Sequence, residues 1–258
     1  MALSTDLTPY RVFLSELVTA SGPIIQKNFW NPALAVEQKS DQTPVTEADR
    51  AAEAAMRKLI NTRFPQHGIL AEEYGPERAD AEWTWVLDPI DGTKAFVHGV
   101  PLFGTLIGLL YQGQPVLGAI HQPILNLLCI GDGQATTLNG RPVRVRDTRS
   151  MAEATLLTTC MVDPARRHNP VAWQRMLNSA KLVRTWGDCY GYLLVATGHA
   201  DVMCDAIMNA WDVLPIVPII RGAGGLITDW QGGEVGDQKS CLAASPRLHR
   251  MALDLLLT

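Results

Sequence analysis

Apolar and polar residues follow two different periods along the first half of the chain. Residues 12–18 carry apolar side chains at helical spacing, and they predict a helix that begins at Thr8-Pro9, an N-cap followed by proline. A second, alanine-rich helix is predicted from its N-cap Thr46 to about Arg63. Short apolar runs bounded by turn residues predict strands at residues 68–71, 83–87, 102–111, 115–122 and 127–130. We therefore expect helices packed on a mostly antiparallel sheet in this half.

The pattern changes at the charged stretch 146–153. This stretch is the predicted boundary between a first half, residues 1–148, and a second half, residues 149–258. Beyond it, strand and helix patterns alternate, with strands predicted at residues 154–160, 182–185, 200–204, 226–229 and 241–244, and helices at residues 170–179, 190–197, 211–221 and from Ser245-Pro246 onward. Such alternation predicts α/β layering in the second half.

Composition and charge narrow the classes of function. The 258 residues, 47% of them hydrophobic, are enough to bury a sizeable core. A formal net charge of -4 without a long Lys/Arg run argues against binding to nucleic acid or an anionic membrane. The five cysteines form no C-x-x-C pair, which favours buried thiols in a reducing compartment over a zinc site or a disulfide framework. With no signal-peptide pattern and no membrane-length apolar run, the expected location is cytoplasmic.

The most informative segment is the string Trp-Val-Leu-Asp-Pro-Ile-Asp-Gly-Thr at residues 85–93. An apolar strand ends in Asp88, and a second carboxylate, Asp91, follows three residues later beside Gly92 and Thr93. Carboxylates at a strand end are costly to bury unless a positive group neutralises them, and two that converge suit Mg²⁺ or Ca²⁺. Asp-Pro and Asp-Gly are also ordinary turn dipeptides, but the full string is much rarer than its parts.

Three further acidic positions strengthen this reading, although each also has a purely structural explanation. Glu72-Glu73 follows a short apolar strand, where it could be a solvated pair. Asp49 lies three residues after Thr46, as in a capping box, and Asp212 lies near the start of a predicted helix, where the helix dipole favours an acid. Their joint presence with Asp88 and Asp91 favours a metal site.

Together these residues carry a family likeness. Ala71-Glu-Glu73, the Asp88–Thr93 string, Ala210-Trp-Asp212 and Ala223-Gly-Gly225 resemble the metal-site motifs of the inositol monophosphatase superfamily, in its order and approximate spacing. Pro44-Val-Thr-Glu-Ala-Asp49 resembles a further element of that pattern. The resemblance implies an α+β / α/β fold, layered as an α-β-α-β-α sandwich. It also implies a magnesium-dependent hydrolase of phosphate monoesters.

The resemblance assigns the metal ligands. Glu72, Asp88 and the backbone carbonyl of Ile90 would hold one magnesium ion. Asp88, Asp91 and Asp212 would hold a second, so that Asp88 bridges the two. Two divalent ions about 3.5–4 Å apart can clamp the attacking and leaving oxygens of an in-line displacement.

The resemblance also implies catalytic roles. Asp49 and Glu72 would help a third, weaker ion or the nucleophilic water, and Thr93 would orient that water. The backbone N–H groups of Gly92 and Thr93 are expected to hold phosphate oxygens at the start of the next helix. Lys94 could steer the phosphate or be a solvated helix residue.

Two features narrow the choice of substrate. A lysine, Lys94, follows Thr93, and residues 184–192 resemble the corresponding segment of histidinol-phosphate phosphatases of this superfamily. Nucleotide 3'-phosphatases share the lysine but usually have a Gly-Ser-Ser type of segment where this chain has Trp-Gly-Asp-Cys. The resemblance puts Asp205 where the family contacts the organic part of the substrate. A carboxylate there, with that of Asp188, would suit the ammonium and imidazole of histidinol phosphate. The hydroxyl groups of a polyol could also use such an acid.

Several alternatives stay open at this stage. Within the superfamily, the chain could be an inositol monophosphatase or a nucleotide 3'-phosphatase. A non-catalytic binding protein on the same scaffold would be expected to lack a metal carboxylate, and all those expected are present. A calcium module of the EF-hand type is disfavoured because its ligand spacing is absent around Asp88. The resemblance further implies a small-molecule substrate and a homodimer.

Overall fold

The computed structural model describes residues 6–38 and 44–258. Its helices are α1 (Thr8–Asn28), α2 (Glu47–Arg63), α3 (Thr93–Val97), α4 (Asp163–Arg167), α5 (Pro170–Ser179), α6 (Asp188–Ala196), α7 (Ala210–Val213), α8 (Ile216–Gly222) and α9 (Pro246–Leu257), with a 3-10 turn at Met151–Glu153. Its strands are β1 (Val36–Gln38), β2 (Pro44–Thr46), β3 (Gly68–Ala71), β4 (Trp83–Asp91), β5 (Gly104–Tyr111), β6 (Gln114–Gln122), β7 (Leu127–Gly131), β8 (Thr136–Leu138), β9 (Arg141–Pro142), β10 (Thr155–Leu157), β11 (Leu182–Arg184), β12 (Val202–Met208), β13 (Leu226–Thr228) and β14 (Lys239–Ala244).

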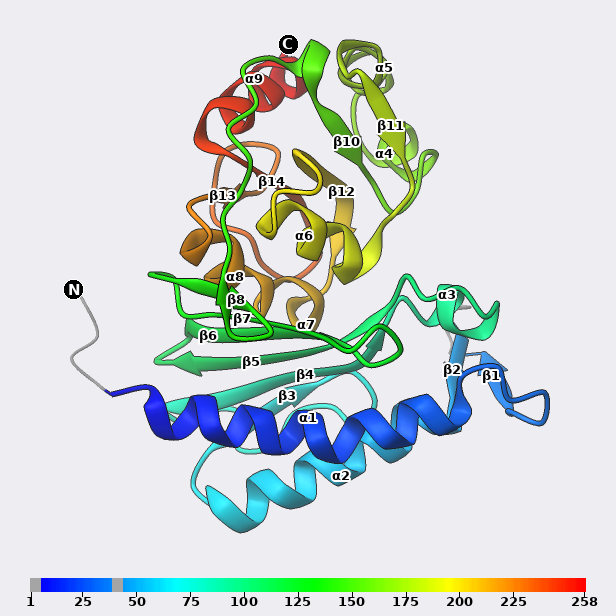
Figure 1. Ribbon diagram of the computed structural model, residues 1–258, viewed down its shortest axis with the longest axis vertical. Coiled ribbons are helices and arrows are strands. Elements are labelled where there is room, and N and C mark those ends of the chain that lie inside the picture. Colours follow the sequence, from blue (N-terminus) through cyan, green and yellow to red (C-terminus); the bar gives the residue numbers. More distant parts are fainter. Residues whose placement is uncertain (1–5, 39–43) are drawn as a thin grey trace.

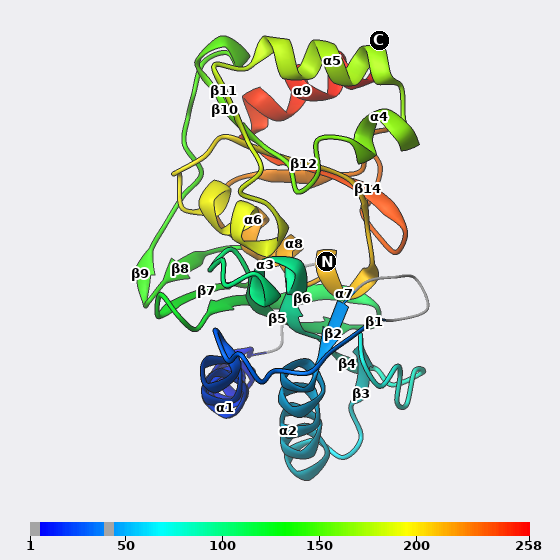
Figure 2. The same ribbon diagram turned by 90° about the vertical axis from the view of Figure 1, so that its right-hand side faces the viewer.

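Most of these elements stack in five layers, and β1 and β2 form a separate two-stranded sheet (Figures 1 and 2). Helices α1 and α2 cover one face of a seven-stranded sheet of order β3-β4-β5-β6-β7-β8-β9, in which only the β3–β4 pairing is parallel. Helices α6, α7 and α8 lie between that sheet and a mixed five-stranded sheet of order β11-β10-β12-β14-β13. Helices α4, α5 and α9 cover the far side of the second sheet. The expected α-β-α-β-α sandwich is confirmed.

The first two helices form largely as expected. Thr46 caps α2, since its side chain accepts a hydrogen bond from the amide of Ala48 at 3.2 Å. The start of α1 differs by one residue, because the N-cap is Leu7 and the amide of Thr8 donates to Asp6 Oδ1 at 2.9 Å. An acid two residues upstream therefore does the work expected of a threonine cap.

The predicted helix at residues 211–221 is instead two helices, α7 and α8. Pro215 stands at the break, where it has no N–H to donate and its ring would clash with the preceding turn of a continuous helix. A Cβ on Gly118 of β6 would lie 1.8 Å from the carbonyl oxygen of Pro215, so only glycine lets the break pack against the sheet. This close approach brings α7 against β4, where the acidic string ends.

A buried acid anchors the segment that joins the two sheets. Asp201 accepts hydrogen bonds from Arg146 Nε at 2.8 Å and from the amide of Thr155 at 2.7 Å.

Strand β10 ends at Leu157, earlier than the predicted 154–160. The division of the chain between residues 148 and 149 stays a prediction.

Candidate metal centre and active site

Asp88 and Asp91 lie at the end of β4. The sequence suggests that Pro89 fixes a turn between them, but the strand continues through Asp91 and its pairing with β5 shifts register between the two acids. Thr105 Oγ1 donates to the carbonyl oxygen of Pro89 at 2.9 Å within this irregularity. The irregular pairing therefore sets the spacing of the two carboxylates.

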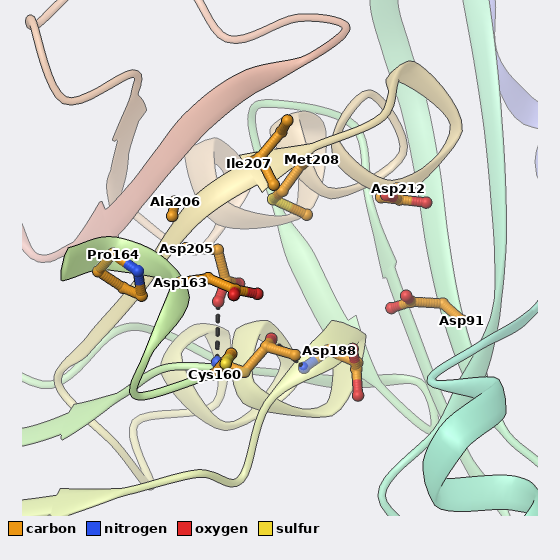
Figure 3. Close-up of a pocket in the computed structure, with 11 residues that line it drawn as sticks. Asp91, Cys160, Asp163, Pro164, Asp188, Asp205, Ala206, Ile207, Met208 and Asp212 are labelled. Atoms are coloured by element: carbon orange, nitrogen blue, oxygen red, sulfur yellow. Dashed lines mark hydrogen bonds between the residues drawn. The ribbon is translucent and has the colours of Figure 1, made fainter. Parts of the chain in front are cut away.

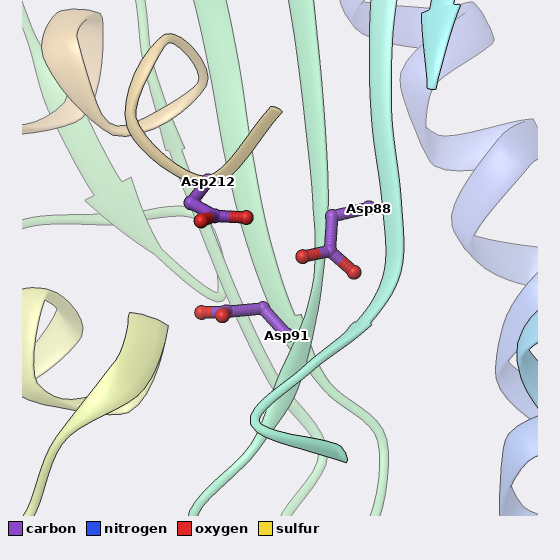
Figure 4. A group of neighbouring side chains, drawn as sticks. All are labelled: Asp88, Asp91 and Asp212. Carbon is purple, nitrogen blue, oxygen red and sulfur yellow. The ribbon is translucent and has the colours of Figure 1, made fainter. Parts of the chain in front are cut away.

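Asp212 reaches the same place from the second half of the chain. It lies in the first turn of α7, where its Oδ2 accepts hydrogen bonds from the amide of Asn209 at 2.9 Å and from the side-chain nitrogen of Asn209 at 3.1 Å. The structural explanation given for this acid, a carboxylate near a helix start, therefore also holds, and Asp212 completes a capping box with Asn209. One oxygen each of Asp88, Asp91 and Asp212 nevertheless lies within 4.8 Å of the others. Figure 4 shows the three carboxylates facing one another.

Burial, followed by the crowding of like charges, raises the pKa values of these acids. Burial is the main cause for Asp88, whose pKa lies well above its usual range and is raised further by the charges of Glu72, Asp91 and Asp212. The pKa of Asp91 is also well above its usual range, first through burial and then through Asp188 and Asp212. Burial raises the pKa of Asp212 to about 7. The cluster therefore needs positive charge to be fully ionised near neutral pH.

Two buried oxygens mark where that charge would be placed. Asp88 Oδ1 and Asp49 Oδ1 are buried without a hydrogen-bond partner among the residues that the structure describes. Asp49 uses its other oxygen in the predicted capping box, where it accepts from the amide of Thr46 at 2.9 Å. A set of carboxylates with unpartnered oxygens fits a hard divalent cation such as Mg²⁺.

Glu72 lies beside this cluster. It follows β3, and its amide donates to the carbonyl oxygen of Leu87 at 3.3 Å. Its charge raises the pKa values of Asp49, Asp88 and Asp212, so one acid influences all three. Glu72 is not one of the three mutually close carboxylates, and its place among the metal ligands stays a prediction.

The Gly-Thr pair after Asp91 has a constrained geometry. Gly92 has a φ of 90°, and a Cβ there would lie 3.0 Å from the carbonyl oxygen of Leu102. Thr93 begins α3, and its hydroxyl donates to the carbonyl oxygen of Ile90 at 2.9 Å. The threonine expected to orient the attacking water is therefore tied to the carbonyl expected to bind metal.

A cavity of about 100 Å³ opens beside these carboxylates (Figure 3). Asp91 and Asp212 lie on one side of it, and three more acids, Asp163, Asp188 and Asp205, line it together with uncharged residues of β12 and of residues 159–164. Of the expected substrate contacts, the structure therefore brings Asp188 and Asp205 to the cavity. The described residues that line it do not include Gly92, Thr93 or Lys94.

The three additional acids are held differently. Asp205 is buried, and its oxygens accept from the amide of Thr159 at 2.8 Å and from Tyr192 OH at 3.0 Å. Asp188 begins α6 with a φ of 50°, and burial, followed by the charges of Asp205 and Asp212, raises its pKa to about 7. The exposed Lys94 lowers that pKa, so the lysine acts on the site through its charge.

Asp163 was not found from the sequence. It begins the short helix α4, three residues after the end of the predicted strand 154–160. Asp-Pro at a helix start is a common pattern. Only the tertiary fold brings this acid to the lining of the cavity, which it shares with Asp205 (Figure 3).

The two halves of the chain meet at Asp91. The amide of Cys189, in the first turn of α6, donates to Asp91 Oδ2 at 2.5 Å. Asp91 belongs to the first sheet, whereas α6 and the Asp212-bearing helix α7 follow strands of the second. The site therefore requires both halves in place.

These features define a protein with a carboxylate cluster suited to a divalent cation, beside a small cavity. The chain belongs to the inositol monophosphatase family, whose model matches residues 6–257, and it is a phosphoric monoester hydrolase. It is 41% identical to the bifunctional phosphatase IMPL2 of Arabidopsis thaliana over 88% of this chain and 66% of that protein. It is 40% identical to a histidinol-phosphatase of Chlorobaculum parvum over 88% of each chain. A solved inositol monophosphatase from Zymomonas mobilis is 34% identical and superimposes with a TM-score of 0.88, covering 98% of this chain and 100% of that one.

The family is metal-dependent, typically with Mg²⁺, in agreement with the acidic cluster. Within the described residues, no helix is long and apolar enough to cross a bilayer.

The raised pKa values predict how Mg²⁺ and pH act together on stability. Asp188 and Asp212 have pKa values of about 7 in the metal-free fold, against an ordinary value of 3.8. The folded state thus binds protons more tightly than the unfolded state, and the stability gained from protonation is lost as pH rises from about 4 to about 7. Bound Mg²⁺ takes over the role of the proton at Asp212, which is one of the three mutually close carboxylates. The increase in Tm caused by Mg²⁺, measured against a chelator, should grow from pH 5 to pH 8.

His121 also makes stability depend on pH, but it does not affect the comparison of Tm with and without Mg²⁺. Burial lowers its pKa to about 4, so its contribution to stability is lost at acid pH, the opposite trend. This contribution is present with and without Mg²⁺ and cancels in the difference between the two Tm values. A Mg²⁺ increment that stayed constant across this pH range would contradict the assignment of Asp212 as a metal ligand.

Proposed function

We propose that this hydrolase acts on L-histidinol phosphate and releases L-histidinol and phosphate. The observation that carries the proposal is the cavity beside the metal-binding acids, which Asp163, Asp188 and Asp205 line. A leaving group with an ammonium and an imidazole would find opposite charge there. The identity of 40% to a histidinol-phosphatase supports the same choice.

We assign the ion sites to the chain's own oxygens. Glu72, Asp88 and the carbonyl of Ile90 would hold one Mg²⁺, and Asp88, Asp91 and Asp212 a second. A third, weaker ion would lie near Glu72. When bound, the ions supply a hydroxide near neutral pH and neutralise charge on the phosphate and the leaving oxygen.

The chain supplies positioning and proton transfer. Thr93 Oγ1 donates its proton to the Ile90 carbonyl. The lone pairs of the Thr93 hydroxyl oxygen would then accept a hydrogen bond from the attacking water and orient it. Asp49 Oδ1 is buried and unpartnered among the described residues, so this oxygen would accept a hydrogen bond from the nucleophilic water. The N–H groups of Gly92 and Thr93 would hold phosphate oxygens, with Lys94 adding long-range attraction for the anion.

The organic part of the substrate would lie in the acidic cavity. Both oxygens of Asp205 already accept hydrogen bonds, so Asp163 and Asp188 are the better partners for direct ion pairs. Asp205 adds negative charge behind them. This arrangement makes the charge of the leaving group, more than its shape, the basis of specificity.

Comparing substrates tests the proposal. We expect kcat/KM for L-histidinol phosphate to exceed that for myo-inositol 1-phosphate by at least about 100-fold, since two ion pairs of about 1.4 kcal/mol each give this ratio. Asp163→Asn should raise KM for histidinol phosphate about tenfold and leave the inositol ester unaffected. A large preference for the inositol ester would overturn the assignment.

The alternative with specific support is an inositol monophosphatase. The similarity to the Zymomonas mobilis enzyme favours it, and polyol hydroxyls could donate to the same carboxylates. A third candidate, a nucleotide 3'-phosphatase, is tested by including a nucleoside 3'-phosphate among the compared substrates. The homodimer and the cytoplasmic location stay predictions, and sedimentation analysis would test the first.

A further inference from the structure

Helix α2 carries a second acid that the mechanism above does not use. Asp49, Glu53 and Arg57 follow one another at intervals of four residues, so they share one face of the helix. Asp49 lies in the metal centre. The side chain of Glu53 is 0% exposed and lies one turn further along.

Glu53 binds the backbone immediately after Glu72. Its Oε2 accepts from the amide of Glu73 at 2.8 Å, and its Oε1 accepts from the amide of Tyr74 at 3.1 Å. Oε1 also accepts from Arg57 Nε at 2.7 Å. A single buried carboxylate therefore fixes two successive peptide groups next to an expected metal ligand.

Arg57 holds the far side of the same turn. Its Nη1 donates to Glu77 Oε1 at 3.2 Å, and its Nη2 donates to the carbonyl oxygen of Gly75. The guanidinium carbon also lies 5.8 Å from the ring centroid of Tyr74. With Glu53, Arg57 ties residues 73–77 to helix α2.

We propose that Glu53, oriented by Arg57, is a positioning residue for the metal centre. Glu53 fixes the turn after β3 before Mg²⁺ binds. Glu72 can then present its carboxylate to the ion with little further loss of conformational entropy. One rigid helix then places both Asp49, directly, and Glu72, through the backbone. This inference rests on the proposed role of Glu72 as a metal ligand.

Such a role differs from simple stabilisation in what it predicts for metal affinity. Partners that orient a metal ligand typically contribute about 10- to 100-fold to metal affinity or activity. Glu53→Gln keeps the size of the side chain but leaves one carbonyl oxygen for three donors. Isothermal titration with Mg²⁺ should show a Kd raised about tenfold. Excess Mg²⁺ should restore most of kcat.

Asp201→Asn is the matched control. Asp201 is likewise a carboxylate with 0% side-chain exposure, bound to an arginine and a backbone amide, but it lies in the other half of the chain. We expect a similar loss of Tm in both variants and an altered Mg²⁺ Kd in Glu53→Gln alone. Equal, unchanged Kd values in the two variants would overturn the proposal.

Two further variants settle the remaining outcomes. Glu72→Gln should weaken Mg²⁺ binding. If it does not, the proposed role of Glu72 is wrong. If Mg²⁺ binding is weakened in Glu72→Gln but normal in Glu53→Gln, only the role of Glu53 is contradicted.

If Glu53→Gln does not fold, Arg57→Lys decides, because it keeps the charge but loses the contacts to Gly75 and Glu77. Its Mg²⁺ Kd should rise, and a wild-type value would reject the positioning role.

Discussion

Asp91→Asn should lower kcat/KM by at least about 10³-fold. Asp91 lies among the three mutually close carboxylates and is expected to hold one ion with Asp88 and Asp212. Loss of that ion removes several kcal/mol of transition-state stabilisation, and each ~1.4 kcal/mol corresponds to a factor of ten. The measurement is phosphate release at saturating Mg²⁺.

The same variant should fold normally. Asparagine can still accept the hydrogen bond from the amide of Cys189, and removal of one negative charge relieves repulsion with Asp188 and Asp212. The metal-free Tm should therefore equal or exceed that of the wild type. Asp132→Asn is a suitable control, since Asp132 pairs with Arg11 away from the centre and its loss should leave turnover unchanged. Near-normal turnover of Asp91→Asn would show that the ligand assignment is wrong.

Thr93→Val should lower kcat about 10²-fold with little change in KM. Valine has nearly the same shape but cannot orient the attacking water or bind the Ile90 carbonyl. Positioned groups that handle a proton in the transition state contribute about 10²–10⁴-fold, and Thr93 shares this role with Asp49. Steady-state kinetics on the preferred substrate would give kcat and KM separately.

Thr105→Val provides the comparison for this result. Thr105 also donates to a carbonyl of the same strand end, that of Pro89, at an equal distance of 2.9 Å, but it is fully buried in the sheet. Its loss should cost about 1 kcal/mol of stability and little of kcat. Equal losses of kcat in the two variants would mean that Thr93 acts only through the backbone.

Local patterns in the sequence were sufficient for much of the fold. Thr46 caps α2 as expected, and β3 has the predicted ends, because caps and short apolar runs are encoded by neighbouring residues. The break at Pro215 was missed because the apolar spacing on both sides of it suits one helix. Proline alone should have indicated the interruption.

The residues of the site likewise fall into those that a local sequence pattern indicates and those that no such pattern indicates. Asp88, Asp91 and Asp212 could be found because they stand in characteristic strings, and the structure brings them together. Asp163 and Glu53 have no such string. Their importance depends on which parts of the chain they face after folding, a property that neither composition nor spacing carries.

Anomalous diffraction from a crystal soaked with Mn²⁺, a substitute for Mg²⁺, tests the central claim most directly. A density peak bounded by the carboxylates of Asp88, Asp91 and Asp212 is the predicted result, with a second beside Glu72 and the Ile90 carbonyl. An empty cluster in crystals of a preparation that Mn²⁺ activates would contradict the account.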